Sequence, residues 1–372
     1  MSLLKSRFIE MFGDVINNKK TWPTKRWSDV LNIVNGKNQK KVECENGIYP
    51  ICGSGGKIGK TNEYLTKENS VIIGRKGNIN NPILMKTKFW NVDTAFGLEP
   101  NNKEINVEYL YKFCELFDFQ RLNKTVTIPS LTKSDLLKIE IPVPPMKLQE
   151  EYRNFLAQVD KSKFLLQQIL KKLELLKKSR FIEMFGDPIK NEKRWAQLTL
   201  NSVCDGIGDG LHGTPEYDDS GDFYFINGNN LINGEIVITP STKKVNEEVF
   251  KKYYRNISSN ALLLSINGTL GKIAFYNNEA ITLGKSACYI NLKTFVNKYF
   301  VFELMKTDHF LKYLEENSTK STIKNVSLKT IRNFQLIYPP ENLQNDFISF
   351  SKKIDKSKLI IQKALEDLVG KV

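Results

Sequence analysis

Two stretches of the chain repeat apolar residues at alternating steps of four and three, which is the spacing of a helix with one buried seam. In the first stretch the seam consists of Leu148, Tyr152, Phe155, Val159, Leu166, Ile169 and Leu173. In the second stretch it consists of Leu343, Phe347, Phe350, Ile354, Ile361 and Leu368. Such a seam also fits a helix that packs only on a globular core, but two matching seams favour mutual packing. We therefore predict two long helices that pair as an antiparallel coiled coil.

The expected ends of these helices are marked by proline and glycine. Each stretch follows a Pro-Pro pair, which can precede a helix but cannot lie inside one. Gly186, followed closely by Pro188, is expected to stop the first helix. The 38 residues from Leu148 to Phe185 would make a helix of about 57 Å.

The rest of the chain has the pattern of two mixed α/β globules, at about residues 20–140 and 190–335. Short β-rich stretches lie between Gly, Asn and Pro turns at Ser70–Gly74, Phe223–Ile226, Glu235–Thr239 and Ala261–Ile266. A helical stretch follows in each globule, at Val107–Asn123 and at Asn297–Asn317. Because no βαβ rhythm is present, the sequence predicts an α+β fold and argues against a doubly wound parallel sheet.

An internal repeat organises these parts. Lys5–Asp14 recurs without change as Lys178–Asp187, 173 positions later. Ile141–Gln149 resembles Leu336–Gln344 at a spacing of 195, and Asp160–Lys163 returns as Asp355–Lys358 at the same spacing. The two globules are therefore expected to share one plan.

Similarity between the two copies is weaker inside the globules. We expect Lys25–Trp27 to correspond to Lys193–Trp195, and Val71–Gly77 to Leu262–Gly268. The change in spacing from 173 to 195 predicts about 22 extra residues in the second copy, around Gly206–Gly234. Similar edges with divergent interiors are expected if the edges assemble while the interiors read different targets.

The first residues repeat the tail of the central helix, whereas the C-terminal stretch ends before this motif. We therefore expect the N-terminal segment to supply the missing tail in space and to complete a circular pseudo-twofold arrangement. The expected divisions are an N-terminal segment at 1–14, a first globule at 15–145, a central helix at 146–187, a second globule at 188–340 and a C-terminal helix at 341–372.

Composition excludes several classes of protein. With 372 residues, 41% hydrophobic and 11% aromatic, the chain is neither disordered nor limited to one ordinary core. Its longest apolar run, Ala261–Leu264, is too short to span a bilayer, and its start lacks a signal-peptide pattern. Five scattered cysteines without a Cys-x-x-Cys pair indicate reduced thiols and a cytoplasmic location.

Charge points to a polyanionic partner. There are 55 Lys and Arg residues against 41 Asp and Glu, which gives a net charge of +14. This excess favours nucleic-acid binding, although A·T-rich genomes also encode Lys-rich proteins regardless of function. No long basic amphipathic helix is left over for a membrane surface.

Catalytic patterns are not apparent. Gly53–Thr61 looks like a phosphate-binding loop, but Ser54 stands where the first glycine of that loop is needed. His212 lies in a Gly/Pro-rich loop, and His309 falls in a helical stretch where we expect a structural role. Neither histidine accompanies a nucleophile or a metal-ligand motif, and Asn81–Leu84 does not match an adenine methyltransferase motif.

Loops rich in Gly, Asn and Lys recur in both globules and are candidates for DNA recognition. Arg and Lys can pair with guanine and Asn with adenine, while Lys and backbone amides hold phosphates; such loops are also common solvated turns. The predicted DNA-binding residues of the first globule are Lys37, Ser54, Gly55, Lys57, Arg75, Lys76 and Asn78. Those of the second globule are His212, Thr214, Asn229, Asn230, Asn267, Thr269 and Lys272.

The chain resembles the specificity subunit of type I restriction–modification enzymes over essentially its whole length. The motifs that carry the resemblance, together with the Lys5–Asp14 repeat, are Tyr49–Gly56, Ile72–Gly77, Asp93–Phe96, Pro144–Glu150 and Asp209–Pro215. The resemblance implies that both globules are target recognition domains, each reading half of an asymmetric, bipartite site in double-stranded DNA. It implies that the helices set the spacing and dock two methyltransferase subunits, with restriction subunits joining the complex.

The same resemblance implies that this chain is not an enzyme and holds neither cofactor nor metal. S-adenosylmethionine, Mg and ATP would be bound by the partner subunits alone. A basic coiled-coil adaptor without sequence-specific DNA binding is the alternative hypothesis. A fused or self-sufficient enzyme would need methyltransferase motifs, which we do not find.

Overall fold

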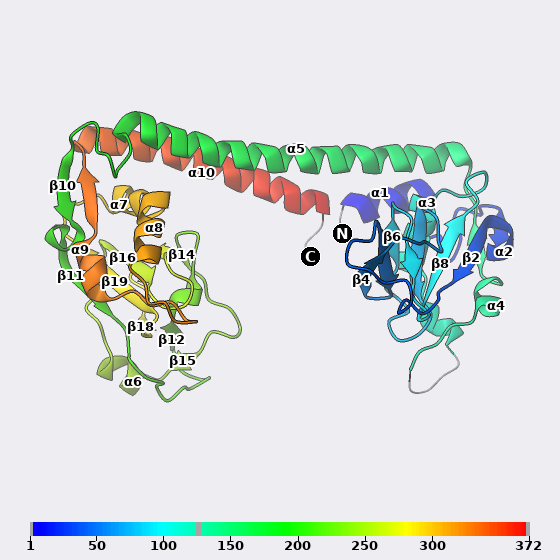
Figure 1. Cartoon of the computed structure of the whole chain (residues 1–372), viewed down its shortest axis with the longest axis horizontal. Coiled ribbons are helices and arrows are strands. Elements are labelled where there is room, and N and C mark those ends of the chain that lie inside the picture. The colour runs from blue at the N-terminus through cyan, green and yellow to red at the C-terminus, as the bar shows by residue number, and fades with distance from the viewer. Residues whose placement is uncertain (1–2, 124–127, 370–372) are drawn as a thin grey trace. The chain divides into compact units, whose positions relative to one another are not determined.

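The structure, a computed structural model, describes residues 3–123 and 128–369 (Figure 1). The outermost parts of the expected N- and C-terminal segments, residues 1–2 and 370–372, lie outside the described residues. The chain divides into two compact units, residues 1–168 with 361–372 and residues 169–360. Each long helix thus contributes to both units, so this division differs from the borders expected at the ends of the helices.

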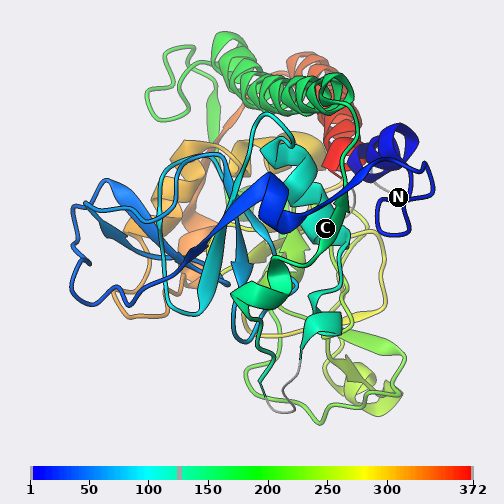
Figure 2. The same ribbon diagram turned by 90° about the vertical axis from the view of Figure 1, so that its right-hand side faces the viewer.

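The first unit contains a four-stranded and a three-stranded sheet, whose strands are blue to cyan in Figure 2. The four-stranded sheet has the order β2 (Leu31–Asn35), β8 (Ala95–Pro100), β5 (Ser70–Gly74), β6 (Ile83–Met85) and is antiparallel. The three-stranded sheet has the order β4 (Gly56–Thr61), β3 (Tyr49–Gly53), β7 (Trp90–Asn91), with β3 and β7 parallel.

The second unit repeats this topology. Its four-stranded sheet has the order β11 (Cys204–Asp209), β19 (Ala287–Leu292), β16 (Ala261–Ser265), β17 (Ile273–Phe275). Its three-stranded sheet has the order β15 (Lys244–Val245), β12 (Phe223–Ile226), β18 (Ile281–Leu283), and β12 and β18 are again parallel. The predicted common plan and the mixed α/β character are confirmed.

A two-stranded sheet joins the start and the end of each globule. In the first unit β1 (Thr24–Arg26) pairs with β9 (Glu140–Pro142), and α2 (Trp27–Val30) follows β1. In the second unit β10 (Ala196–Thr199) pairs with β20 (Gln335–Tyr338), and the 3-10 helix η2 (Leu200–Val203) follows β10. Both edges of the sequence repeat are therefore adjacent in space within each unit.

Central strands are buried on both faces, which explains their continuous apolar runs. In β5, Val71 and Ile73 belong to the main core of the first unit. Ile72 belongs to a second, smaller core that also contains Cys52 of β3. Because neighbouring strand residues point to opposite faces, the four-stranded sheet is covered on one face by the helical core and on the other by the three-stranded sheet.

The expected helical stretches are shorter than predicted. Val107–Asn123 forms α3 (Val107–Leu116) and the 3-10 helix η1 (Phe119–Leu122). Asn297–Asn317 forms α7 (Lys298–Met305) and α8 (Asp308–Glu316), divided where the Thr307 side chain caps α8 by accepting from the Phe310 amide. Capping by a threonine starts a new helix where apolar periodicity alone suggested one continuous helix. The remaining short helices are α4 (Lys133–Leu136), α6 (Glu247–Lys252), η3 (Gly228–Asn230) and α9 (Leu328–Asn333).

Both long helices are present. α5 spans Met146–Phe185, 40 residues in length, and α10 spans Glu341–Val369. α5 ends as predicted, because Gly186 follows with φ +76° and donates its amide to Ile182 O. Each start is fixed by a buried glutamine: Gln149 Nε2 donates to Pro144 O and Gln344 Nε2 to Pro339 O, both at 2.8 Å. These bonds explain the repeated Pro-Pro-x-x-Leu-Gln pattern.

The first turns of each seam contact the globule of their own unit. Tyr152 lies in the core of the first unit, with Leu148 and Phe155 packed against it. Phe347 lies in the core of the second unit, with Leu343 packed against it. These positions therefore pack on the globule of their own unit, and Phe347 in addition contacts Phe181 of α5.

Within the second unit, α5 and α10 do contact each other. Glu174 pairs with Lys358, Lys177 Nζ lies 3.0 Å from Asp355 Oδ2, and the rings of Phe181 and Phe347 are 5.3 Å apart. Residue numbers rise on one helix as they fall on the other, so this stretch is antiparallel. A coiled coil over the full length of the seam stays a prediction; its residue Ile169 is 42% exposed.

The N-terminal segment forms α1 (Leu3–Phe12) and replaces a helix tail within the first unit, as predicted. Phe8 and Phe12 pack on Tyr109 and Tyr152 with ring centroids 4.9 to 5.7 Å apart. In the second unit the repeated residues Phe181 and Phe185 pack in the same way, on Phe300 and Phe347. We call each set of four rings a docking cluster.

The residues that follow Lys5–Asp14 and Lys178–Asp187 correct the alignment of the two copies. Trp22 Nε1 donates to Phe12 O at 3.0 Å, and Trp195 Nε1 donates to Phe185 O at 2.8 Å. Trp22, and not Trp27, is therefore the counterpart of Trp195, so the expected match of Lys25–Trp27 with Lys193–Trp195 was wrong. Trp27 is a fully buried core residue at the start of α2.

The extra residues of the second copy lie later than expected. Val92 N bonds to Cys52 O, and Gly284 N bonds to Ile226 O, so Cys52 and Ile226 are counterparts 174 positions apart. By β16 the spacing is 191, as the match of Val71–Gly77 with Leu262–Gly268 requires. The insertion therefore falls between Ile226 and Ala261 and forms β13 (Leu231–Ile232), β14 (Glu235–Ile236) and α6.

The cysteines are unpaired and, apart from Cys44, buried. Burial raises the pKa of Cys52 to about 11 and that of Cys204 to about 12. These thiols are therefore protonated and unreactive at neutral pH. No helix among the described residues is long and apolar enough to cross a bilayer.

Candidate nucleic-acid interface

In the first unit, three loops that carry predicted DNA-binding residues are tied to one segment, Asn91–Thr94. Lys37 N donates to Asn91 O at 3.0 Å, and Arg75 N donates to Thr94 O at 2.8 Å. Val92 N donates to Cys52 O at 3.0 Å, just before the turn that contains Ser54. We call Asn91–Thr94 the junction segment, because backbone bonds fix all three loops around it.

The second unit has an equivalent junction segment, Leu283–Ser286. Leu211 N donates to Leu283 O at 2.7 Å, and Ile266 N donates to Ser286 O at 3.0 Å. Gly284 N donates to Ile226 O at 2.9 Å. The loops that carry His212, Asn229 and Asn267 are therefore held together in the same manner, and the recurrence noted in the sequence reflects one shared framework.

Most predicted residues of the first unit are accessible. Lys37, Gly55, Lys57, Lys76 and Asn78 are exposed, and Ser54 is half-buried. Lys57, however, lies on β4 beside a separate hollow with Cys44 and Lys60. The structure thus groups Lys37, Ser54 and the Arg75–Asn78 loop around the junction segment, and Lys57 lies on β4, paired with Cys52 of β3.

Arg75 is held by contacts with an aromatic ring and a backbone carbonyl. Its guanidinium carbon lies 5.7 Å from the centre of the Phe96 ring, and its Nη1 is 3.5 Å from Asp93 O. Stacking on an aromatic ring orients a guanidinium while leaving donors available. The side chain is half-buried. Arg75 is therefore suited to a bidentate contact with a guanine edge.

The second unit contains a polar hollow of about 370 Å³ beside its junction segment. It brings the predicted residues His212 and Asn267 together with Asp209, Lys285 and Asn325. His212 Nε2 lies 2.6 Å from Asp209 Oδ2, which orients the imidazole. Asn267 Nδ2 donates to Asn325 Oδ1 at 3.4 Å. The hollow thus presents a cation, amides and an oriented histidine, which are groups that bind base edges and phosphates.

Lys285 and Asn325 were missed by sequence reasoning. Lys285 occupies the position of Asp93 in the motif Asp93–Phe96, so aligning the two motifs could have found it. Asn325 comes from a loop far along the chain and pairs with Asn267 as an isolated bridge. No local signal marks it, because only the tertiary fold brings the two loops together.

Asn230 has a structural role. Its Nδ2 donates to Val237 O at 3.0 Å and to Thr242 Oγ1 at 3.3 Å. Its Oδ1 accepts from Asn227 N at 3.0 Å. Because these bonds occupy the amide on both sides, Asn230 holds the start of the inserted segment and is a poor reader of bases. The neighbouring Asn229 is exposed.

The remaining predicted residues lie on two loops of the second unit. Thr214 is exposed after His212. Thr269 and Lys272 lie in the β16–β17 loop, whose backbone is held by Ser265: Ser265 Oγ donates to Thr269 O at 2.6 Å and accepts from Lys272 N at 2.9 Å. The Thr269 side chain is exposed and that of Lys272 is half-buried.

Gly77 and Gly268 are counterparts that the loop conformation requires. Both have φ +78°, a left-handed conformation that side chains with Cβ adopt at a cost. Gly77 N donates to Pro129 O at 3.0 Å, and Gly268 N donates to Lys324 O at 2.9 Å. The shared glycine therefore turns the loop that contains it toward Pro129 in the first unit and toward Lys324 in the second.

Nucleotide binding by Gly53–Thr61 does not fit the structure. β3 and β4 form a tight antiparallel hairpin through this segment. A phosphate-binding loop needs a helix N-terminus after the glycines, and here a strand follows. Among residues 3–123 and 128–369, no group of three His, Cys, Asp or Glu side chains could hold a metal ion.

Comparison with known proteins identifies the family. The type I restriction modification DNA specificity domain matches residues 19–175 and 192–369. The chain therefore belongs to this family and carries the domain twice. It is a DNA sequence-specificity subunit of a type I restriction–modification system, which is the non-catalytic kind of subunit in such a system.

Individual relatives are distant but cover most of the chain. A chain named as a putative type I specificity subunit in Mycoplasma pneumoniae is 22% identical over 301 residues, 78% of each chain. The type I restriction enzyme MjaVIII specificity subunit of Methanocaldococcus jannaschii is 22% identical and covers 98% of this chain and 92% of its own. A chain solved in work on complex assembly and conformational transition of the type I R-M system has the same fold, with a TM-score of 0.60, 17% identity and 93% of each chain covered.

Proposed function

We propose that the two units read the two halves of an asymmetric, bipartite duplex site through the loops around their junction segments. This proposal rests on one observation: the same backbone hydrogen bonds surround both junction segments, but the side chains at equivalent positions differ. Lys37 corresponds to Leu211, and Asp93 to Lys285. Lys76 of the first unit corresponds to Asn267 of the second. Equal frameworks with unequal reading groups suit two unequal half-sites.

The chemistry of the loops suggests the kind of base that each unit reads. The first unit offers Arg75 and Lys76, which favour guanine O6 and N7. The second offers Asn267, whose amide matches adenine N6 and N7. Lys37, Lys285 and backbone amides would hold phosphates, which position the protein without reading sequence.

We further propose that the long helices dock two methyltransferase subunits, joined by restriction subunits. Within the second unit, Leu175, Leu176, Leu359 and Ile360 are at least half exposed on α5 and α10. Apolar residues gathered on helix surfaces are expected to be covered in an assembly. S-adenosylmethionine, Mg and ATP would then be bound by these partners in the cytoplasm, and this chain would bind none of them.

DNA binding by the full chain, alone and with a co-expressed methyltransferase partner, tests the proposal. Affinity for duplex DNA should fall steeply as salt rises from about 50 to about 200 mM, because phosphate contacts release counterions. Methylome sequencing of a host that carries the complex should reveal one bipartite, asymmetric motif. If neither preparation binds duplex DNA, the result would favour the coiled-coil adaptor instead.

A further inference from the structure

Two segments with ten identical residues occupy different sites in this protein. Lys5–Asp14 docks in the first unit, and Lys178–Asp187 docks in the second. The shared phenylalanines meet two aromatic rings in each cluster, Tyr109 and Tyr152 in the first unit and Phe300 and Phe347 in the second. The residue just before the repeat differs: it is Leu4 in one copy and Lys177 in the other.

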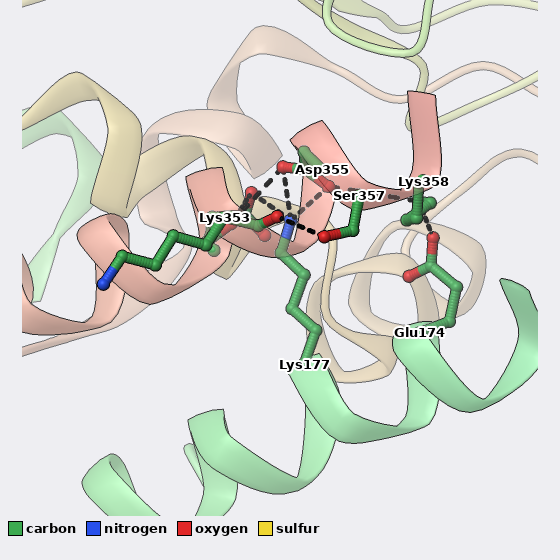
Figure 3. Close-up of polar contacts among 8 residues, drawn as sticks. Glu174, Lys177, Lys353, Asp355, Ser357 and Lys358 are labelled. Atoms are coloured by element: carbon green, nitrogen blue, oxygen red, sulfur yellow. Dashed lines mark hydrogen bonds and ion pairs between the residues drawn. The ribbon is translucent and has the colours of Figure 1, made fainter. Parts of the chain in front are cut away.

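Lys177 is a buried cation with a matched set of partners, shown in part in Figure 3. Its Nζ lies 2.7 Å from Glu303 Oε1 and 3.0 Å from Asp355 Oδ2. Ser351 Oγ donates to Glu303 Oε1 at 3.1 Å. Burial lowers the pKa of Lys177, but the two carboxylates outweigh it and the net pKa is raised, so the side chain is charged at neutral pH. Removing the cation would leave the largely buried carboxylate of Glu303 without its cationic partner, whereas Asp355 would keep Lys358 at 4.0 Å.

The first unit has a different set at the equivalent positions. Glu303 lies three residues after Phe300, and Ser351 lies four residues after Phe347. The equivalent positions of the first unit are found by the same steps from Tyr109 and Tyr152. Glu303 corresponds to Lys112, and Ser351 corresponds to Leu156. Of Glu303, Ser351 and Asp355, only Asp355 has an acidic counterpart, which is Asp160. A lysine introduced in place of Leu4 would therefore meet Lys112, which is already paired with Glu115 at 2.6 Å, and an apolar side chain, where Lys177 meets a carboxylate and a hydroxyl.

We propose that the residue preceding the repeated segment selects its docking site. Lys177 directs the tail of α5 to the acidic site of the second unit, and Leu4 directs α1 to the first. The binding surface, which we call the acceptor, consists of the residues of each docking cluster that contact the repeated helix, together with the charged residues beside them. The repeated helix that binds there comes from the same chain or from a second copy. Without this difference, identical segments would compete for both acceptors and copies of the chain could exchange them.

The first test places the wrong residue in front of α1. In the full chain, Leu4→Lys is expected to lower the amide hydrogen-exchange protection of residues 5–12 at least tenfold, because the introduced ammonium group lacks the carboxylate that Glu303 provides for Lys177. Peptic fragments that begin before residue 4 distinguish this segment from its identical copy. The matched control is Leu3→Lys, which adds the same charge at an exposed neighbour and should change protection less than twofold.

The second test rewrites the acceptor. Leu4→Lys combined with Lys112→Glu restores a carboxylate next to Asp160 and should return the protection of α1 to within threefold of the unaltered chain. In the second unit, Lys177→Leu should lower the protection of residues 178–185, whereas Lys178→Leu, at an exposed pair with Asp308, should not. Unchanged protection in Leu4→Lys overturns the proposal. So does a double variant that fails to fold or to recover protection.

Discussion

The ring of Phe8 packs edge-on against the ring of Tyr152, with 5.3 Å between their centroids. The same distance separates Phe181 from Phe347 in the second unit. In the second unit the first ring of the pair comes from the tail of α5. In the first unit it comes from an N-terminal segment far away in the sequence. One docking geometry is thus built twice from segments with different connections.

Phe8→Ala should destabilise the protein by about 3–5 kcal/mol, because it removes a fully buried ring from a docking cluster. Urea-induced unfolding, followed by circular dichroism, measures the change. Ile9→Ala is the control on the same helix, since Ile9 is an exposed side chain. Equal loss in both variants would show that helix propensity, and not docking, stabilises α1.

Arg75→Ala and Asn267→Ala should each relax recognition of one half-site only. Loss of a bidentate base contact costs about 1–3 kcal/mol, which corresponds to roughly 5- to 150-fold weaker binding. Competition binding with duplexes altered in one half-site at a time measures the effect. A loss of affinity that is equal for all sequences would instead identify these side chains as phosphate contacts.

Asn229→Ala and Asn230→Ala should change different properties of the protein. Asn230→Ala removes three hydrogen bonds of the inserted segment and should lower the free energy of unfolding by about 1–3 kcal/mol. Asn229→Ala should leave stability unchanged and weaken binding to the second half-site. Thermal unfolding and DNA binding of the two variants, measured side by side, decide whether the structure divides their roles correctly.

Stability should decrease as the pH falls below about 6.5 because of His309. Burial lowers the pKa of His309, and the negative charge of Asp187 opposes this only in part. The unfolded chain therefore takes up a proton at a higher pH than the folded chain, so the stabilisation is present above about pH 6.5 and is lost below it. His309→Gln should flatten this dependence below about pH 6.5. An unchanged slope in His309→Gln would assign the dependence to other groups.

The sequence predicted the repeated framework well because its signals are local. The Pro-Pro pairs, the stop at Gly186 and the apolar runs of β5 and β16 depend on neighbouring residues alone. Of the predicted DNA-binding residues, Arg75, His212 and Asn267 lie where the loops converge, and their contacts with DNA stay a prediction. Asn230 was selected for its residue type, but hydrogen bonds to Val237 and Thr242 make it structural.

By itself, the sequence determined that the chain consists of two copies of one plan, with long helices and divergent loops. The tertiary structure decided which contacts those helices make: Tyr152 enters the core of the first unit, and Phe347 lies in the core of the second unit against Phe181 of α5. It also decided that Trp22 is the counterpart of Trp195, and that Lys285 and Asn325 join the reading loops. These results depend on contacts between residues far apart in the chain, which periodicity and local motifs do not encode.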